Sequence, residues 1–165
     1  EEAMVLPGEV YVGGDSHTNT TGAMGAFAAG LGHTDVAYVL MNGQIWFKLD
    51  AGTREDFAHT NGVALDPETH VARLIHAAAR CPTWVQTCLF ARDGRPPTAV
   101  SIDRYVALVE RAGALGATLA GVHLYSLARP SRQPEGERLA ALTATELEPI
   151  AARLRALGLV VKVSA

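Results

Sequence analysis

Hydrophobic and polar positions alternate along the chain between short apolar runs and longer amphipathic stretches. The short runs are rich in β-branched and aromatic residues and predict strands, several of them apolar throughout, as in strands buried on both faces of a sheet. Trp46, Phe47 and Trp84 fall within these runs, so we expect them in the core. The predicted strands are EVYVG (9–13), QIWFKL (44–49), TWVQTCLF (83–90), LAGVHLYS (119–126) and LVVKVS (159–164).

Helical periodicity fills the intervals between the predicted strands. Asp66, Thr98 and Thr143 stand at the starts of three of these intervals as N-cap candidates. Gly158 follows the last interval, at a position where a glycine commonly ends a helix. The predicted helices cover residues 22–30, 34–41, 66–80, 98–115 and 143–157.

The alternation of strand and helix predicts an α/β fold in which about five parallel strands are joined by right-handed crossovers. Periodicity leaves open whether these strands form an open sheet or a partial (β/α) barrel. A chain of 165 residues, 48% of them hydrophobic, is within the size of one domain, so we expect a single α/β domain over residues 1–165. The edges of such a sheet expose apolar strands, which predicts a homo-oligomer formed through these edges.

Charge and composition exclude several classes of function. The formal net charge is −3 and the arginines are dispersed among Asp and Glu, so a nucleic-acid partner is not expected. The first residues lack the pattern of a signal peptide, and no run approaches the roughly 20 apolar residues of a membrane span. We therefore expect a cytoplasmic protein that does not contact a membrane.

The cysteines and histidines do not have the spacing of a metal site. Cys81 and Cys88 are separated by six residues, which matches neither a zinc motif nor a redox motif, and we expect both to be buried and reduced. His70 and His76 are six positions apart and point to different faces of a predicted helix. No metal ligands are therefore predicted.

Polar residues follow the predicted strands, and the loops after parallel strands converge on the usual place of ligand sites. Asp15 and His17 are a candidate catalytic pair, because a carboxylate orients an imidazole and supports its charged form. The alternative is that Asp15 and Ser16 cap a helix while His17 is a solvated loop residue. The predicted polar rim consists of Asp15, Ser16, His17, Thr18, Asp50, Thr53, Arg92, Asp93, Arg129, Ser131 and Arg132.

Arginines on this rim suggest anion binding. The guanidinium forks of Arg92, Arg129 and Arg132 can pair with two oxygens of a carboxylate or a phosphate. With Ser16 and Thr18 they are the candidate residues for binding a small carboxylate or phosphate anion. The alternative is that the three arginines are ordinary solvated surface residues.

The segment PGEVYVGGDSHTNTTGAMGAFAAGLGHTDVAYVLMNGQIWFK, residues 7–48, resembles the Asp-Ser-His-Thr region of the aconitase superfamily, particularly its 3-isopropylmalate dehydratase branch. In that family the segment lies beside a [4Fe–4S] cluster, and the Asp and His of the motif bind substrate and handle the hydroxyl that is eliminated and re-added. The resemblance implies catalytic roles for Asp15 and His17, with Ser16 and Thr18 in the same loop.

From about Lys48 to the C-terminus the chain resembles the carboxyl-terminal half-barrel of radical S-adenosylmethionine proteins. The similar stretches are LDAGTREDF, DPETHVARL, WVQTCLF, VHLYSLARPSRQPE and RALGLVVKVS. The C-x3-C-x2-C loop that holds the radical-generating cluster in that family is absent from this sequence. The two resemblances together indicate a chimera whose parts, residues 1–48 and 48–165, join within the strand QIWFKLD.

Both families depend on [4Fe–4S] clusters, and the second also on S-adenosylmethionine, whereas two cysteines supply too few thiolates for such a cluster. We therefore expect no cofactor in the isolated chain, and we expect Asp15 and His17 to be inactive in it. The predicted function is that of a catalytically incomplete chimera that retains weak anion binding. The alternative is a fragment of an aconitase-type hydro-lyase, or of a radical S-adenosylmethionine enzyme, that needs further segments to hold its cluster.

Overall fold

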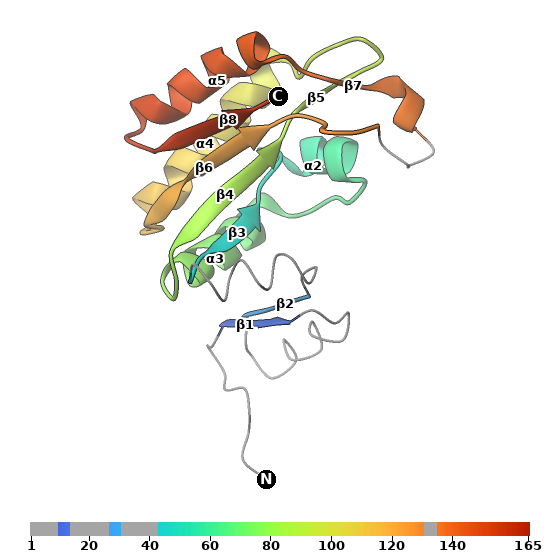
Figure 1. The fold of residues 1–165 in the computed structure, drawn as a ribbon. Coiled ribbons are helices and arrows are strands. Elements are labelled where there is room, and N and C mark those ends of the chain that lie inside the picture. Colours follow the sequence, from blue (N-terminus) through green and yellow to red (C-terminus); the bar gives the residue numbers. More distant parts are fainter. Residues whose placement is uncertain (1–9, 14–26, 31–42, 131–134) are drawn as a thin grey trace.

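A parallel sheet of four strands forms the centre of the protein (Figure 1). The computed structural model describes residues 10–13, 27–30, 43–130 and 135–165. The sheet is open, so the prediction of an α/β fold with parallel strands is confirmed and the sheet is not a closed barrel. Its strands, in spatial order, are β3 (Ile45–Lys48), β4 (Thr83–Cys88), β6 (Leu119–Tyr125) and β8 (Val161–Ser164).

Three helices lie against one face of this sheet: α3 (Pro67–Ala78), α4 (Ala99–Ala114) and α5 (Ala144–Ala156) (Figure 1). The predicted N-caps are confirmed, because Asp66, Thr98 and Thr143 each accept a hydrogen bond from a backbone N–H in the first turn. Gly158 follows α5 with a φ of 82°, which glycine adopts without strain. In the part of the chain that the structure describes, no helix has the length and apolarity to span a membrane.

Alternation along the strands decides which side chains enter the core. Phe47 points toward the helices and is buried, as predicted. Trp46 is 41% exposed and Trp84 is half-buried, because both point to the opposite face of the sheet, so their predicted place in the core is wrong. The fully buried side chains of the core include Leu49, Phe57, Val71, Leu74, Val85, Tyr105, Val109, Val122, Leu124, Leu147 and Leu154.

The N-terminal part departs from the predicted single sheet of five strands. Strand β1 (Val10–Gly13) pairs in parallel with β2 (Phe27–Gly30) in a separate two-stranded sheet. Strand β2 also lies within residues 22–30, where a helix was predicted, because pairing with β1 overrides the helix preference of its alanines. The helix predicted over residues 34–41 lies outside the described residues.

The predicted strand over residues 83–90 is also interrupted. Strand β4 ends at Cys88, and β5 (Phe90–Arg92) leaves the central sheet to pair antiparallel with β7 (Leu139–Ala141). The buried hydroxyl of Ser126 fixes this departure, since it donates to the Leu89 carbonyl at 2.7 Å and accepts from the Leu142 N–H at 2.7 Å. Strands β3 and β8 form the edges of the central sheet, and self-association through them stays a prediction.

His70 of α3 is a half-buried titratable group beside the core. Its ring packs against Phe47 and Phe57, with ring centroids 4.9 and 5.4 Å away. The Nε2–H donates to the Lys48 carbonyl at 2.8 Å, while the buried Nδ1 has no hydrogen-bond partner among the described residues. Burial and the nearby Arg73 lower the pKa of His70, and together they outweigh the Lys48 carbonyl and Asp50, which raise it.

We expect the protein to lose stability as the pH falls below the ordinary histidine pKa of 6.5. The unfolded chain then binds a proton that His70 resists in the fold, so this stability is complete above pH 6.5 and lost below it. Urea unfolding at several pH values between about 8 and about 5 measures this. The free energy of unfolding of His70→Gln, which keeps the N–H donor, should fall less over this range than that of the wild type. The matched variant His59→Gln should behave like the wild type. Parallel pH profiles for the wild type and His70→Gln would contradict this assignment.

Candidate functional site

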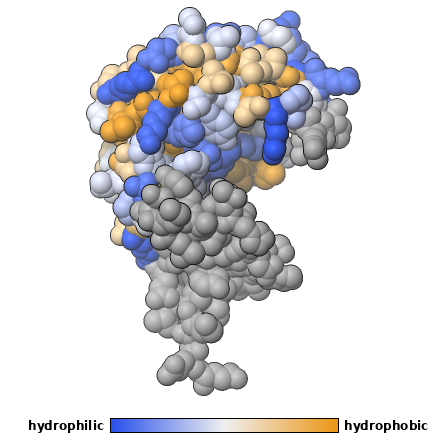
Figure 2. All heavy atoms as spheres, viewed as in Figure 1, coloured by the Kyte–Doolittle hydropathy of each residue, from blue (hydrophilic) through white to orange (hydrophobic). Residues whose placement is uncertain are grey.

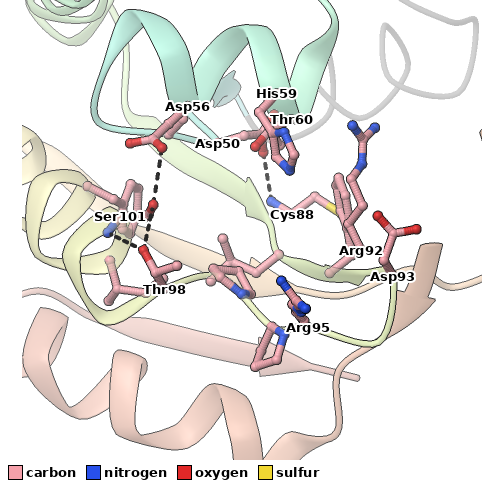
Figure 3. Close-up of a pocket in the computed structure, with 17 residues that line it drawn as sticks. Asp50, Asp56, His59, Thr60, Cys88, Arg92, Asp93, Arg95, Thr98 and Ser101 are labelled. Atoms are coloured by element: carbon pink, nitrogen blue, oxygen red, sulfur yellow. Dashed lines mark hydrogen bonds between the residues drawn. The ribbon is translucent and has the colours of Figure 1, made fainter. Parts of the chain in front are cut away.

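A pocket of about 310 Å³ lies at the carboxyl ends of β3 and β4 (Figure 3). Its walls are the helix α2 (Arg54–Asn61), the N-terminal end of α4, and β5 with the turn that follows it. Ligand sites of parallel α/β proteins occupy this place, and the volume suits a small ligand. We call it the arginine pocket, after its lining residues Arg92 and Arg95; Arg95 lies across it from α2 and Arg92 at its side (Figure 3).

Asp50 forms the floor of the arginine pocket and is 4% exposed. Its carboxylate accepts hydrogen bonds from Lys48 Nζ at 2.8 Å and from Asn61 Nδ2 at 2.7 Å. A third bond comes from the backbone N–H of Cys88 at 2.7 Å. Burial lowers the pKa of Lys48, but the Asp50 carboxylate and a hydrogen bond with Tyr125 raise it by more, so the net pKa lies above its usual value. The ammonium of Lys48 therefore stays charged and neutralises Asp50.

The other carboxylates of the pocket also have partners within the chain. Asp56 accepts a hydrogen bond from the hydroxyl of Thr53 at 2.8 Å. It accepts another from the hydroxyl of Ser101 at 3.1 Å (Figure 3). Asp93 accepts two bonds from Arg138, at 2.8 and 2.6 Å, and these bonds hold the pKa of its carboxyl below the usual range. Asp93 is therefore paired with a cation, whereas Asp56 is bonded to neutral hydroxyls and keeps its negative charge.

The arginine and histidine side chains of the pocket have far fewer hydrogen-bond partners. The Nε of Arg92 is buried without a hydrogen-bond partner among the described residues, and its Nη2 lies 3.6 Å from the Glu135 carboxylate. Arg95 and His59 are exposed, and neither side chain forms a hydrogen bond or an ion pair within the described part of the chain. The N-terminus of α4, capped by Thr98, adds the positive end of a helix dipole. The donors left over in the pocket therefore favour an anion.

The structure places part of the predicted polar rim at this pocket. Asp50, Arg92 and Asp93 line it, as expected from their positions after strands. Thr53 caps α2 instead, and the exposed Arg129 is not among the lining residues. The remaining rim residues lie outside the described residues: Asp15, Ser16, His17, Thr18, Ser131 and Arg132.

Sequence reasoning missed Asp56, His59 and Arg95. Asp56 and His59 lie on α2, a short helix whose sequence has no apolar periodicity that would predict it. The spacing of Thr53 and Asp56 is a capping signal that could have predicted where this helix begins. Arg95 sits in a turn that begins with Asp93 at a φ of 53° and Gly94 at 70°. The Asp-Gly pair predicts such a turn, but not the direction of the arginine that follows it.

The cysteines do not fit an iron–sulfur cluster. Cys81 precedes β4 and Cys88 ends it, so at ~3.3 Å per residue the six-residue strand separates them by about 20 Å. Burial raises the pKa of both thiols, which disfavours the thiolates that iron binds. Both are unpaired and half-buried, not fully buried as predicted. Over the described ranges, no three His, Cys, Asp or Glu residues are grouped to hold a metal ion.

Comparison with known proteins confirms the resemblance of the N-terminal part to the aconitase superfamily. Residues 1–55 match the model of the Aconitase family (aconitate hydratase). The large subunit of 3-isopropylmalate dehydratase from Wolinella succinogenes is 53% identical over 57 residues, which are 34% of this chain and 14% of that protein. The same subunit from Campylobacter fetus is 49% identical over 57 residues, again 34% and 14%. That from Aquifex aeolicus is 51% identical over 49 residues, which are 30% and 11%.

The chain thus spans about one seventh of the length of the Wolinella succinogenes and Campylobacter fetus proteins, since the match covers 14% of each. No solved structure matches the chain.

Proposed function

We propose that the arginine pocket binds a small carboxylate or phosphate anion through Arg92 and Arg95. The observation that supports this is the imbalance of hydrogen-bond partners: the carboxylates that line the pocket accept hydrogen bonds within the chain, whereas Arg92 Nε has no partner among the described residues. A buried donor without an acceptor costs about 1–3 kcal/mol, and a bound oxyanion would remove this cost at Arg92. A guanidinium fork also binds two oxygens at once.

Calorimetric titration with citrate, 3-isopropylmalate and inorganic phosphate tests this proposal. We expect saturable binding of at least one of these anions, weakened about 10-fold or more by Arg95→Gln, which removes a charged donor without shortening the chain. Arg129→Gln is the matched control, because Arg129 is exposed and does not line the pocket. Equal weakening by both variants, or no binding of any of the three anions, would contradict the proposal.

We further propose that the chain is a chimera and is catalytically incomplete on its own. The family match over residues 1–55 supports the aconitase-like part. The proposed radical S-adenosylmethionine-like part, residues 48–165, rests on the separated motifs in its sequence and on the row of parallel strands that follows Lys48. Asp15 and His17 would be inactive remnants, because a [4Fe–4S] cluster takes its ligands from thiolates and the two cysteines are far apart.

The second candidate is a fragment of an aconitase-type hydro-lyase that works with further segments. The identity of about half of the residues to 3-isopropylmalate dehydratase large subunits over the N-terminal third favours it. Such a fragment would obtain its cluster ligands and the rest of its substrate site from elsewhere.

Anaerobic reconstitution tests the property that both candidates share, which is that the isolated chain cannot hold a cluster. With iron and sulfide added to the isolated chain and then removed by desalting, we expect no stoichiometric iron and no cluster absorption, because two half-buried thiols at opposite ends of β4 cannot share one cluster. Iron content and visible spectra are the measurements. Stoichiometric iron with a cluster spectrum that disappears in a Cys81→Ser, Cys88→Ser double variant would overturn the proposal of an incomplete chain.

A further inference from the structure

Three carboxylates line the arginine pocket, and the chain neutralises two of them. Asp50 is paired with Lys48, and Asp93 is paired with Arg138. Asp56 accepts its hydrogen bonds from uncharged hydroxyls and forms no ion pair within the described part of the chain. Its negative charge is therefore available to a ligand in the pocket.

The Asp56 carboxylate is held in a fixed position and still has acceptor capacity. Its Oδ2 accepts from the Thr53 hydroxyl at 2.8 Å, and its Oδ1 accepts from the Ser101 hydroxyl at 3.1 Å. Thr53 is also the N-cap of α2, so the carboxylate is fixed at the first turn of this helix. A carboxylate oxygen has two lone pairs, and each of these oxygens can accept a further hydrogen bond from a ligand.

Asp56 and the arginines lie at different ends of the arginine pocket. Figure 3 shows Asp56 of α2 beside Ser101 of α4, with Arg92 and Arg95 toward the other end. The two arginines belong to the turn after β5, in which the Arg92 N–H donates to the Arg95 carbonyl at 2.9 Å. A ligand that fills the pocket therefore meets a carboxylate at one end and guanidinium groups at the other.

Polarity alone does not set the arginine pocket apart, because hydrophilic and hydrophobic residues mingle over the surface in view in Figure 2. The pocket differs in having charges of both signs that lack a close counter-ion among the described residues. Arg95 forms no ion pair there, and the nearest carboxylate to Arg92 is 3.6 Å away, at Glu135. The complementary ligand carries an anionic group and a cationic group.

We infer that the ligand of the arginine pocket is a small zwitterion, a carboxylate or phosphate that also carries an ammonium group. This inference rests on the proposed function, because the oxyanion of the zwitterion would occupy the anion site of Arg92 and Arg95. The ammonium would donate to Asp56. Apolar side chains of the lining, Leu89 and Ile102 among them, suit the methylene groups between the two charges.

An ammonium fits the donor set at Asp56 better than a metal ion does. An alkyl ammonium has three N–H donors and needs only hydrogen-bond acceptors, which a single carboxylate provides. A divalent cation takes several ligands, and over the described ranges no three His, Cys, Asp or Glu residues are grouped to hold one. The cationic group is therefore assigned to the ligand itself.

Calorimetric titration with matched pairs of ligands tests this inference in the wild type. The pairs are 3-aminopropionate with propionate, 4-aminobutyrate with butyrate, 5-aminopentanoate with pentanoate, and phosphoethanolamine with ethyl phosphate. At about pH 8 an alkyl ammonium, with an ordinary pKa of about 10.4, is charged. We expect at least one amino compound to bind about 5-fold or more tightly than its partner without the amine. The phosphate pair distinguishes a phosphate zwitterion from a carboxylate one.

Two variants that each remove one negative charge from α2 locate the ammonium. Asp56→Asn should reduce the preference for the amino compound to within about 2-fold and should not weaken binding of its partner, because it removes a charge that repels anions. Glu55→Gln is the matched control, since Glu55 is exposed and does not line the pocket, and it should keep the preference. Circular dichroism spectra that match the wild type show that both variants are folded.

The outcomes separate this inference from the proposed function. Pairs that bind with equal affinity to the wild type, and are weakened alike by Arg95→Gln, would overturn the zwitterion and leave the anion site. A preference that survives Asp56→Asn, or equal weakening of both members of a pair by this variant, would overturn the assignment of the ammonium to Asp56. No binding of any member would overturn the anion site as well.

Discussion

The Asp50→Ala variant should unfold with a free energy about 3 kcal/mol lower than the wild type, because it removes the shared acceptor at the floor of the pocket. The backbone N–H of Cys88 would lose its partner at 2.7 Å, and Lys48 would lose its counter-ion at 2.8 Å. Asn61 would also lose its tie to Asp50, which holds the end of α2 against the sheet. Urea unfolding at neutral pH measures the loss.

Asp103→Ala is the matched control for this carboxylate. Asp103 pairs with Arg153 at 2.8 Å, but its side chain is 62% exposed, so its removal should cost less than about 0.5 kcal/mol. Asp50→Asn should fall between the two, because the amide keeps an oxygen acceptor but loses the charge. A loss at Asp50 no greater than that at Asp103 would show that the buried network does not stabilise the fold.

A loss of about 3 kcal/mol is also expected for Gly52→Ala, because this glycine touches the backbone of α4. A Cβ at Gly52 would lie 2.3 Å from the Arg104 carbonyl carbon and 2.4 Å from the Tyr105 nitrogen. Backbone atoms of a helix cannot rotate away as a side chain can, so the loop after β3 or the helix itself would have to shift. Both border the pocket, and the shift should weaken anion binding too.

Replacing Gly113 by alanine should change the free energy of unfolding in the opposite direction. Gly113 lies in α4, and a Cβ there meets nothing within 4 Å. Gly113→Ala should raise the free energy of unfolding by about 0.5 kcal/mol, since alanine loses less backbone entropy in a helix. Urea unfolding of both variants side by side checks this contrast. Equal effects of the two substitutions would mean that Gly52 is not in close contact with α4.

The sequence was informative where local chemistry decides local structure. Asp66, Thr98 and Thr143 predicted three helix starts, because an N-cap needs only a side-chain oxygen next to its own first turn. The sequence was uninformative where pairing between distant segments decides the local structure. Residues 27–30 read as helix because of their alanines, yet they pair with β1. The end of β4 at Cys88 depends on Ser126, which is far away in the sequence.

The pocket shows the same division. Arg92 and Asp93 follow a predicted strand, and both line the pocket, as their positions in the predicted polar rim implied. Which charges remain available could not be read from the sequence, because it depends on long-range contacts such as Asp93 with Arg138 and Asp56 with Ser101. Arg129, equally plausible as a rim residue, is not among the residues that line the pocket.

The most direct test of anion binding in the arginine pocket is the ¹H–¹⁵N signal of the Arg92 Nε–H group during titration with citrate or phosphate. This N–H is buried and has no acceptor among the described residues, so a bound oxyanion would give it one. We predict a downfield proton shift that saturates with the calorimetric affinity and needs about 10-fold more anion in Arg95→Gln. An Arg92 Nε–H signal that stays fixed while anions bind elsewhere on the chain would contradict the proposed site.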